Sequence, residues 1–137
     1  MKMYANADGA ARGNPGPAAF GAVVYDAAEE ELRALGATIG RGTSNVAEYR
    51  GAIAAVEAAL ELGATELELR LDSELVVRQV QGRYRVRNAA LKPLHARLQR
   101  ALDRLDVARV RHVPRAQNSR ADELANAALD GRLSDVQ

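Results

Sequence analysis

The chain has 137 residues, 47% of them hydrophobic, which is enough for one compact domain with a core of its own. It has no cysteine and two histidines, so thiolate metal sites are excluded, and any metal must be held mainly by carboxylates, which favours Mg²⁺ or Mn²⁺ over zinc. Residues 78–120 carry twelve of the nineteen basic residues and two of the eighteen acidic ones. This favours a polyanion-binding face beside an acidic site, although arginines on solvated helix faces give the same composition.

The first part of the chain predicts three strands and a long helix. A glycine- and proline-rich turn at 13–17 follows the first strand, and the spacing of the next two suits an antiparallel meander. A helix over 43–62 carries an apolar stripe at helical spacing and ends at Gly63. The three strands are 2–8, 20–25 and 32–40.

The second part alternates helices and strands. Strands are predicted at 66–71 and 107–113, and helices at 73–82, 88–102 and from 118 or 119 to about 131, with residues 132–137 as a frayed tail. This order predicts an α/β fold in one domain, 1–137. Its mixed five-stranded sheet has three antiparallel strands followed by parallel ones, with about four helices on its faces. Without a membrane-length apolar run or a secretory signal, a cytoplasmic location is expected.

Four acids stand at the ends of these elements. Asp8 and Asp72 end the first and fourth strands, and Glu48 and Asp122 lie in the first turns of helices. Each has an ordinary explanation: a turn residue, a helix-start acid favoured by the dipole, or a capping box, as for Glu48 three residues after Asn45.

The joint arrangement of the four acids is harder to explain in this way. If the first and fourth strands are neighbours, Asp8 and Asp72 lie side by side where open α/β sheets bind ligands, and both helix acids can face the same end. Converging carboxylates raise each other's pKa unless cations neutralise them. Two divalent ions about 3.5–4 Å apart would do so, and such pairs hydrolyse phosphodiesters. The sequence therefore predicts a metal site formed by Asp8, Glu48, Asp72 and Asp122.

Several motifs around these acids, taken together, resemble ribonuclease H type 1 over nearly the whole chain. The resemblance implies an endonuclease that cuts the RNA strand of RNA–DNA hybrids with two Mg²⁺ or Mn²⁺ ions and leaves 5′-phosphate and 3′-hydroxyl ends. The motifs are Asp8-Gly9, Gly13-Asn14-Pro15-Gly16-Pro17, Thr43-Ser44-Asn45-Val46-Ala47-Glu48, Asp72-Ser73 and Asn118-Ser119-Arg120-Ala121-Asp122.

The resemblance also implies roles for single residues. Asp8 would contact both metals, Glu48 and Asp72 would share them, and Asp122 would hold the second. Glu48 would also approach a ribose 2′-hydroxyl, the group that distinguishes RNA from DNA. The substrate would be bound by Asn14 and Asn45 in the minor groove, by Thr43 at a DNA-strand phosphate, and by the backbone of Gly9 and Ala10 at the 2′-hydroxyl.

The chain departs from the family pattern in two places. Many members carry a longer basic, tryptophan-containing helical insertion, which is reduced here to 81–88. Arg85 and its neighbours would replace it only in part, so weaker or more salt-sensitive hybrid binding is expected. The loop before Asp122 resembles the family's shorter variant, in which an arginine, here Arg115, takes the place of the usual histidine. Counting back from Asp122 without a gap nominates His112 for this place instead. Arg115 is favoured, with an electrostatic role, since arginine stays protonated at neutral pH.

Two alternatives to a hybrid-cutting ribonuclease remain. One is a related nuclease of this architecture that acts on another duplex, and the other is a nucleic-acid-binding module that is catalytically weak or inactive. Presence of all four acids counts against the second. The resemblance favours a monomer and allows weak activity on double-stranded RNA.

Overall fold

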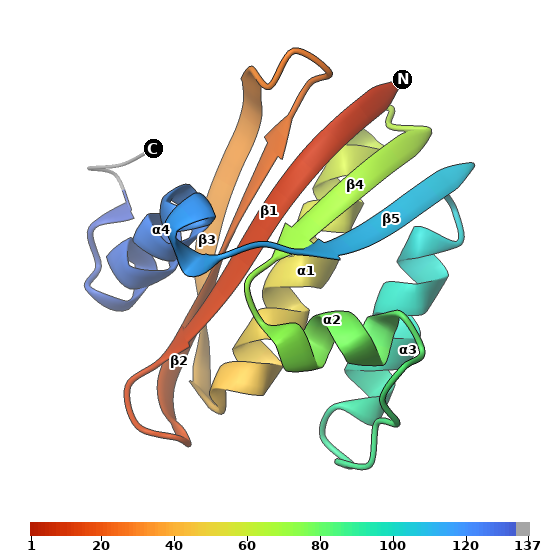
Figure 1. The fold of residues 1–137 in the computed structure, drawn as a ribbon. Helices are drawn as coiled ribbons and strands as arrows, with labels where there is room; N and C mark the ends of the chain where they lie inside the picture. The colour runs from red at the N-terminus through yellow and green to blue at the C-terminus, as the bar shows by residue number, and fades with distance from the viewer. Residues whose placement is uncertain (134–137) are drawn as a thin grey trace.

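The computed structural model describes residues 1–133 and contains the predicted mixed five-stranded sheet, in the order β3-β2-β1-β4-β5 (Figure 1). Its first three strands are antiparallel, whereas β4 pairs in parallel with both β1 and β5. The fold class expected from the sequence is confirmed. The strands are β1 (Lys2–Ala11), β2 (Gly16–Tyr25), β3 (Glu31–Gly42), β4 (Glu66–Leu71) and β5 (Val107–His112).

Four α-helices are found among the described residues, and they cover the two faces of the sheet unequally. The long helix α1 packs behind β1, β2 and β4 with α3 beside it, and α4 lies on the opposite face over β2 and β3 (Figure 1). A short 3₁₀ turn, Arg115–Gln117, precedes α4. The helices are α1 (Ser44–Glu61), α2 (Glu74–Val80), α3 (Lys92–Leu102) and α4 (Ser119–Leu129).

The core lies between α1 and the sheet. Leu67, Leu69 and Leu71 point into it from alternate positions of β4 and are each at most 1% exposed. Burying a leucine of this kind stabilises the fold by roughly 1.5–3 kcal/mol. The buried alanines along α1 have no long side chain to hold the helix away from the sheet. This close approach brings the first turn of α1 against β1.

The strand ends place two of the predicted acids next to each other. The parallel ladder between β1 and β4 ends at Ala7 and Leu71, so Asp8 and Asp72 are the next residue on each strand. The expected end of β1 at residue 8 is wrong, because its antiparallel pairing with β2 continues to Ala11. Asp8 is therefore held by backbone pairing on one side and faces the end of β4 on the other.

The predicted start of α3 also needs correction. The sequence predicts that this helix starts at Asn88, but Asn88 Oδ1 accepts a hydrogen bond from the backbone N–H of Ala90 (2.8 Å) and forms a turn instead. The helix begins at Lys92, with Pro93 in its first turn, where a missing N–H costs nothing.

Within residues 1–133, no helix is both long and apolar enough to cross a membrane. Most of the tail that was expected to fray, 132–137, lies outside the described residues.

Candidate active site

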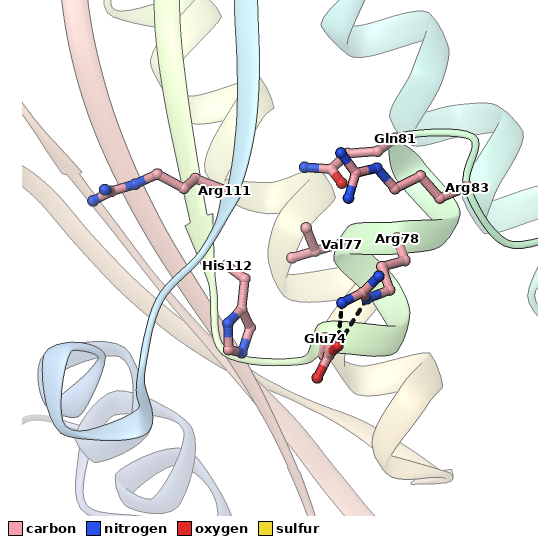
Figure 2. A pocket seen from close by; sticks show the side chains of 7 residues that line it. All are labelled: Glu74, Val77, Arg78, Gln81, Arg83, Arg111 and His112. Atoms are coloured by element: carbon pink, nitrogen blue, oxygen red, sulfur yellow. Dashed lines mark hydrogen bonds and ion pairs between the residues drawn. The ribbon is translucent and has the colours of Figure 1, made fainter.

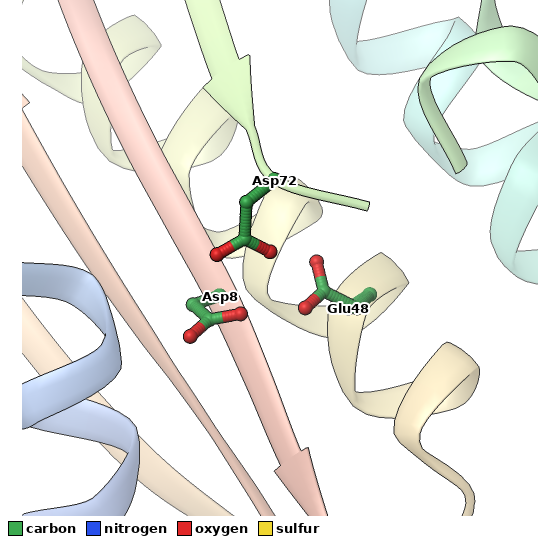
Figure 3. A group of neighbouring side chains, drawn as sticks. All are labelled: Asp8, Glu48 and Asp72. Carbon is green, nitrogen blue, oxygen red and sulfur yellow. The ribbon is translucent and has the colours of Figure 1, made fainter. Parts of the chain in front are cut away.

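Three of the four predicted acids converge at the end of β4. Asp8 on β1, Asp72 after β4 and Glu48 on α1 each offer a carboxylate oxygen, and these oxygens lie within 4.8 Å of one another. Figure 3 shows the three side chains pointing toward a common centre. They line a pocket of about 250 Å³ together with Gly9 and Arg115. Acids far apart in the sequence thus form one acidic site.

Gly9 makes this convergence sterically possible. A Cβ atom at this position would lie 2.5 Å from the carbonyl carbon of Ala47 and still closer to the backbone nitrogen of Glu48. The Gly9 N–H donates to Asp8 Oδ1 (3.0 Å) and to Glu48 Oε1 (2.9 Å), so one backbone group joins two carboxylates. Only glycine allows α1 to lie this close to β1.

The helix-capping explanations for the acids do not hold in the structure. Thr43 caps α1, because its side chain accepts from the N–H of Val46 (3.2 Å), and Glu48 faces Gly9 instead of closing a capping box. Ser73 caps α2 in the same way, which leaves the Asp72 carboxylate free of capping. Both acids are therefore available to the pocket.

The clustering changes the protonation of the two buried acids. Burial, followed by the hydrogen bond and charge of Glu48 and the charge of Asp72, raises the pKa of Asp8 from 3.8 to about 10. Burial likewise raises the pKa of Glu48 from 4.5 to about 6, although its contacts with Asp8 and Gly9 oppose the shift. The contact between the two acids thus favours a proton on Asp8.

Asp122 borders this cluster from the first turn of α4. It contacts the Asp8 side chain, and this contact also raises the pKa of Asp8. Its Oδ1 accepts from Nδ2 of Asn126 one turn later (3.2 Å). The three-acid group within 4.8 Å does not include Asp122, which lies beside the group on the Asp8 side.

The donor set fits a hard divalent cation. The carboxylates of Asp8, Glu48 and Asp72 supply only oxygen ligands, the type that Mg²⁺ and Mn²⁺ prefer. Glu48 Oε2 is buried and has no hydrogen-bond partner among the described residues, which is costly for a carboxylate that nothing neutralises. A cation in this group would compensate both the orphaned oxygen and the mutual repulsion.

Asn118 is a site residue that the sequence reasoning missed. In the sequence it stands at a possible start of the last helix and opens the motif that ends at Asp122, with no role of its own in the site. In the structure it is the N-cap residue but makes no side-chain capping bond. Its side chain is 1% exposed, and Nδ2 donates to the Ala7 carbonyl (2.9 Å) and to Asp72 Oδ2 (3.2 Å). Asn118 therefore orients Asp72. In the sequence, a polar residue before a helix gives no sign of this contact.

Arg115 and His112 occupy different places. Arg115 lines the carboxylate pocket, and its charge lowers the pKa of Glu48. His112, at the end of β5, lines a separate groove beside α2 with Glu74 and Arg78 (Figure 2), and its Nε2 lies 3.3 Å from the Asp72 carbonyl oxygen. The structure thus brings Arg115, and not His112, to the acidic pocket; a role for either residue stays a prediction.

The residues predicted to bind substrate lie near the first turn of α1. Asn14, in the β1–β2 turn, accepts at Oδ1 from the N–H of Ser44 (3.0 Å), which fastens this turn to the helix start. Thr43 and Asn45 flank Ser44, so the structure groups these three predicted residues. Ala10 follows Gly9 on β1 and is half-buried. Their contacts with a nucleic acid stay predictions.

A family model and several known proteins match this chain over most of its length. A family model described as "Reverse transcriptase-like" matches residues 6–128. The "Bifunctional protein Rv2228c" of Mycobacterium tuberculosis is 47% identical over 131 residues, which are 95% of this chain and 36% of that protein. The "Ribonuclease HI" of Halobacterium salinarum is 46% identical over 129 residues, which are 94% of this chain and 65% of that one. This chain thus spans less than two thirds of either relative.

Solved structures extend this likeness to three dimensions. A crystal structure of RNase H1 from Halobacterium salinarum has a TM-score of 0.93 and 45% identity, covering 96% of this chain and 99% of that one. LC11-RNase H1 in complex with an RNA/DNA hybrid has a TM-score of 0.89 and 41% identity, covering 96% and 99%. The chain belongs to the ribonuclease H type 1 family.

Proposed function

We propose that the chain is an endoribonuclease that hydrolyses the RNA strand of RNA–DNA hybrids. The convergence of Asp8, Glu48 and Asp72 within 4.8 Å carries the proposal, since such a cluster suits metal-dependent cleavage of phosphodiesters. A family relative in complex with an RNA/DNA hybrid supports the choice of substrate. The enzyme acts as a cytoplasmic monomer and leaves 5′-phosphate and 3′-hydroxyl ends.

Four carboxylates would hold two Mg²⁺ or Mn²⁺ ions: those of Asp8, Glu48 and Asp72, which are clustered, and that of Asp122, which contacts Asp8. When bound, such a pair activates water and stabilises the leaving oxygen. The Gly9 N–H keeps the Asp8 and Glu48 side chains together, and Asn118 holds Asp72. Three of the four carboxylates, those of Asp8, Glu48 and Asp72, are thus already held close together by the protein.

Selection of the RNA strand would take place beside these carboxylates. We assign recognition of the ribose 2′-hydroxyl to Glu48 and to the backbone at Gly9 and Ala10. Asn14 and Asn45 would line the minor groove, and Thr43 would contact a DNA-strand phosphate. The bond from Ser44 to Asn14 supports this assignment, because it gives the turn and the helix start one fixed geometry.

A comparison of substrates tests the proposal. The protein is incubated with matched duplexes of RNA–DNA hybrid, double-stranded RNA and double-stranded DNA in Mg²⁺ and in Mn²⁺. We expect the hybrid to be cut fastest, double-stranded RNA weakly if at all, and DNA not at all. Preferential cutting of DNA or of duplex RNA would favour a related nuclease. Binding without any cutting would favour an inactive binding module.

Replacing Arg115 is expected to slow cleavage, because its positive charge lies at the acidic pocket where the phosphate must bind. Arg115→Ala should lower kcat on the hybrid by about 100-fold, the lower end of the range for a lost electrostatic contact to the reacting group. Arg115→Lys should restore part of this loss. His112→Ala, in the separate groove, is the matched comparison and should stay within about twofold of wild type. The reverse ranking would assign the role to His112.

Hybrid binding should depend on the basic segment between α2 and α3. Arg85 is exposed there beside Tyr84, which is 47% exposed and has the Arg78 guanidinium 5.5 Å from its ring centroid. Arg85→Ala should weaken binding and lower the slope of log K against log salt by about one, as for a lost phosphate contact. Arg33→Ala removes an arginine paired with Glu61 at the far end of α1 and should leave the slope unchanged. Equal slopes for all three proteins would argue against a contact at Arg85.

A further inference from the structure

A buried amide in β1, two residues before Asp8, has no obvious reason to be there. Asn6 is 5% exposed and lies mid-strand, opposite Val23 of β2 and Arg70 of β4. Asparagine is disfavoured in strands, and burying an amide is costly unless its hydrogen bonds are made. Asn6 Oδ1 has no partner among residues 1–133. Residues that break the local sequence preferences of a strand, as this buried asparagine does, are expected at functional sites.

The other end of the amide is fully used. Asn6 Nδ2 donates to Asn118 Oδ1 (3.0 Å) and to the Gln117 carbonyl (3.4 Å), 112 and 111 residues away along the chain. Both acceptors lie between β5 and α4, on the segment that also carries Arg115. One side chain of β1 therefore ties down the segment that passes over the end of β4 toward α4 (Figure 1).

The contact with Asn118 also has a direction. The amide of Asn118 has a donor and an acceptor end, and only its donor end attracts the Asp72 carboxylate. Because Asn6 occupies Oδ1 of Asn118, the NH₂ group is turned toward Asp72 Oδ2 (3.2 Å) and the Ala7 carbonyl (2.9 Å). A reversed amide would set an oxygen against the carboxylate and leave Asn6 facing an NH₂ group.

We propose that Asn6 is a positioning residue of the active site. It orients the Asn118 amide that holds Asp72, and it fixes to β1 the segment that carries Arg115. The inference rests on the proposed function, in which Asp72 holds a cation. Partners that orient metal ligands typically change metal affinity or activity by about 10–100-fold when they are removed.

The test uses Asn6→Leu, which keeps a side chain of similar size and removes the amide. Its thermal stability should fall modestly, because the buried Oδ1 of Asn118 loses its donor while the removal of the unpaired Asn6 oxygen offsets part of that loss. Its dissociation constant for Mn²⁺, measured by calorimetry, should rise by about tenfold or more, and kcat on the hybrid should fall by about the same factor with KM little changed. Asn6→Ala is measured alongside, so that a packing defect specific to leucine does not decide the result.

Gln79→Leu is the matched control. Gln79 is also a buried amide, 6% exposed, and its Oε1 accepts from the Tyr49 hydroxyl (2.8 Å) between α1 and α2. The Gln79→Leu protein should bind Mn²⁺ and cleave the hybrid within about twofold of wild type, because the bond between Gln79 and Tyr49 does not reach the carboxylates. Equal losses in the Gln79 and Asn6 variants would mean that Asn6 has only a structural role.

A double-mutant cycle tests whether Asn6 affects Mn²⁺ binding through Asn118. If Asn6 acts through Asn118, then adding Asn6→Leu to Asn118→Ala should weaken Mn²⁺ binding little further. Full additivity, or an Asn6→Leu protein that binds Mn²⁺ and cleaves as wild type does, would overturn the inference. Should the wild type bind Mn²⁺ but fail to cut hybrids, the proposed function is refuted. The calorimetric comparison of Asn6 and Gln79 variants still decides the role of Asn6.

Discussion

Asp8→Asn should be more stable than the wild-type protein when divalent cations are removed at alkaline pH. The folded protein holds the pKa of Asp8 at about 10, above its ordinary value of 3.8, and that of Glu48 at about 6, above 4.5. The folded state therefore keeps protons that the unfolded chain has released, so stability falls as pH rises from about 4 toward 10. Asparagine at position 8 has no proton to lose. At pH 8 in chelator we expect a gain on the order of a few kcal/mol, roughly 5–10 °C in Tm.

Thermal unfolding with and without chelator measures this effect between pH 4 and pH 9. The wild type and Asp8→Asn should converge near pH 4, and the gap should open as pH rises. Saturating Mn²⁺ should stabilise the wild type, which binds it, far more than the variant. Asp106→Asn, at an exposed carboxylate before β5, should follow the wild type throughout. A wild-type protein whose metal-free stability rises steadily with pH would contradict the raised pKa of Asp8.

Gly9→Ala should damage both the fold and the site. The added Cβ would lie 2.5 Å from the Ala47 carbonyl carbon and closer to the Glu48 nitrogen, and both are backbone atoms of α1 that cannot move alone. Overpacking of this kind costs typically about 1–3 kcal/mol, and the helix must shift away from β1 to relieve it. The shift would carry Glu48 away from Asp8. Urea unfolding and hybrid cleavage measure the two consequences.

Gly42→Ala is the control for the loss of a glycine as such. An added Cβ there would meet its nearest neighbour, Ile39 Cδ1, at 3.4 Å, and the position lies at the end of β3 beside the start of α1. It should change stability by less than about 1 kcal/mol and leave cleavage intact. If the Gly9→Ala protein had wild-type stability and activity, the added Cβ would have to fit without separating Glu48 from Asp8, which would contradict this account.

The arrangement of the acids could be predicted because it follows from element order. Asp8 and Asp72 each come directly after the last residue of the ladder that joins β1 to β4, so pairing these two strands was enough to place them together. The end of β1 was misjudged because its pairing with β2, which depends on tertiary contact, continues beyond Asp8. Asp122 was grouped with the others, yet its place beside Asp8 rather than within the cluster depends on how α4 packs.

The supporting contacts could not be predicted from local pattern. Gly9 reads as half of a turn dipeptide, and its close approach to α1 is set by a helix that starts 35 residues later. Asn118 reads as a helix cap and Asn6 as an unfavourable strand residue, whereas the two meet across 112 residues. Hydrogen bonds between distant side chains have no periodicity, so only the folded structure shows them.

The central claim is that these carboxylates hold cations that cleave the RNA strand of a hybrid. The most direct measurement maps the cuts in an RNA–DNA hybrid labelled separately on each strand, for the wild type and Asp8→Asn in Mg²⁺, in Mn²⁺ and in chelator. Internal cuts in the RNA strand with 5′-phosphate ends are expected for the wild type with either cation. Asp8→Asn should reduce them by about a thousandfold or more. Cleavage that persists in chelator or in Asp8→Asn, or salt-sensitive binding without cleavage, would contradict the claim.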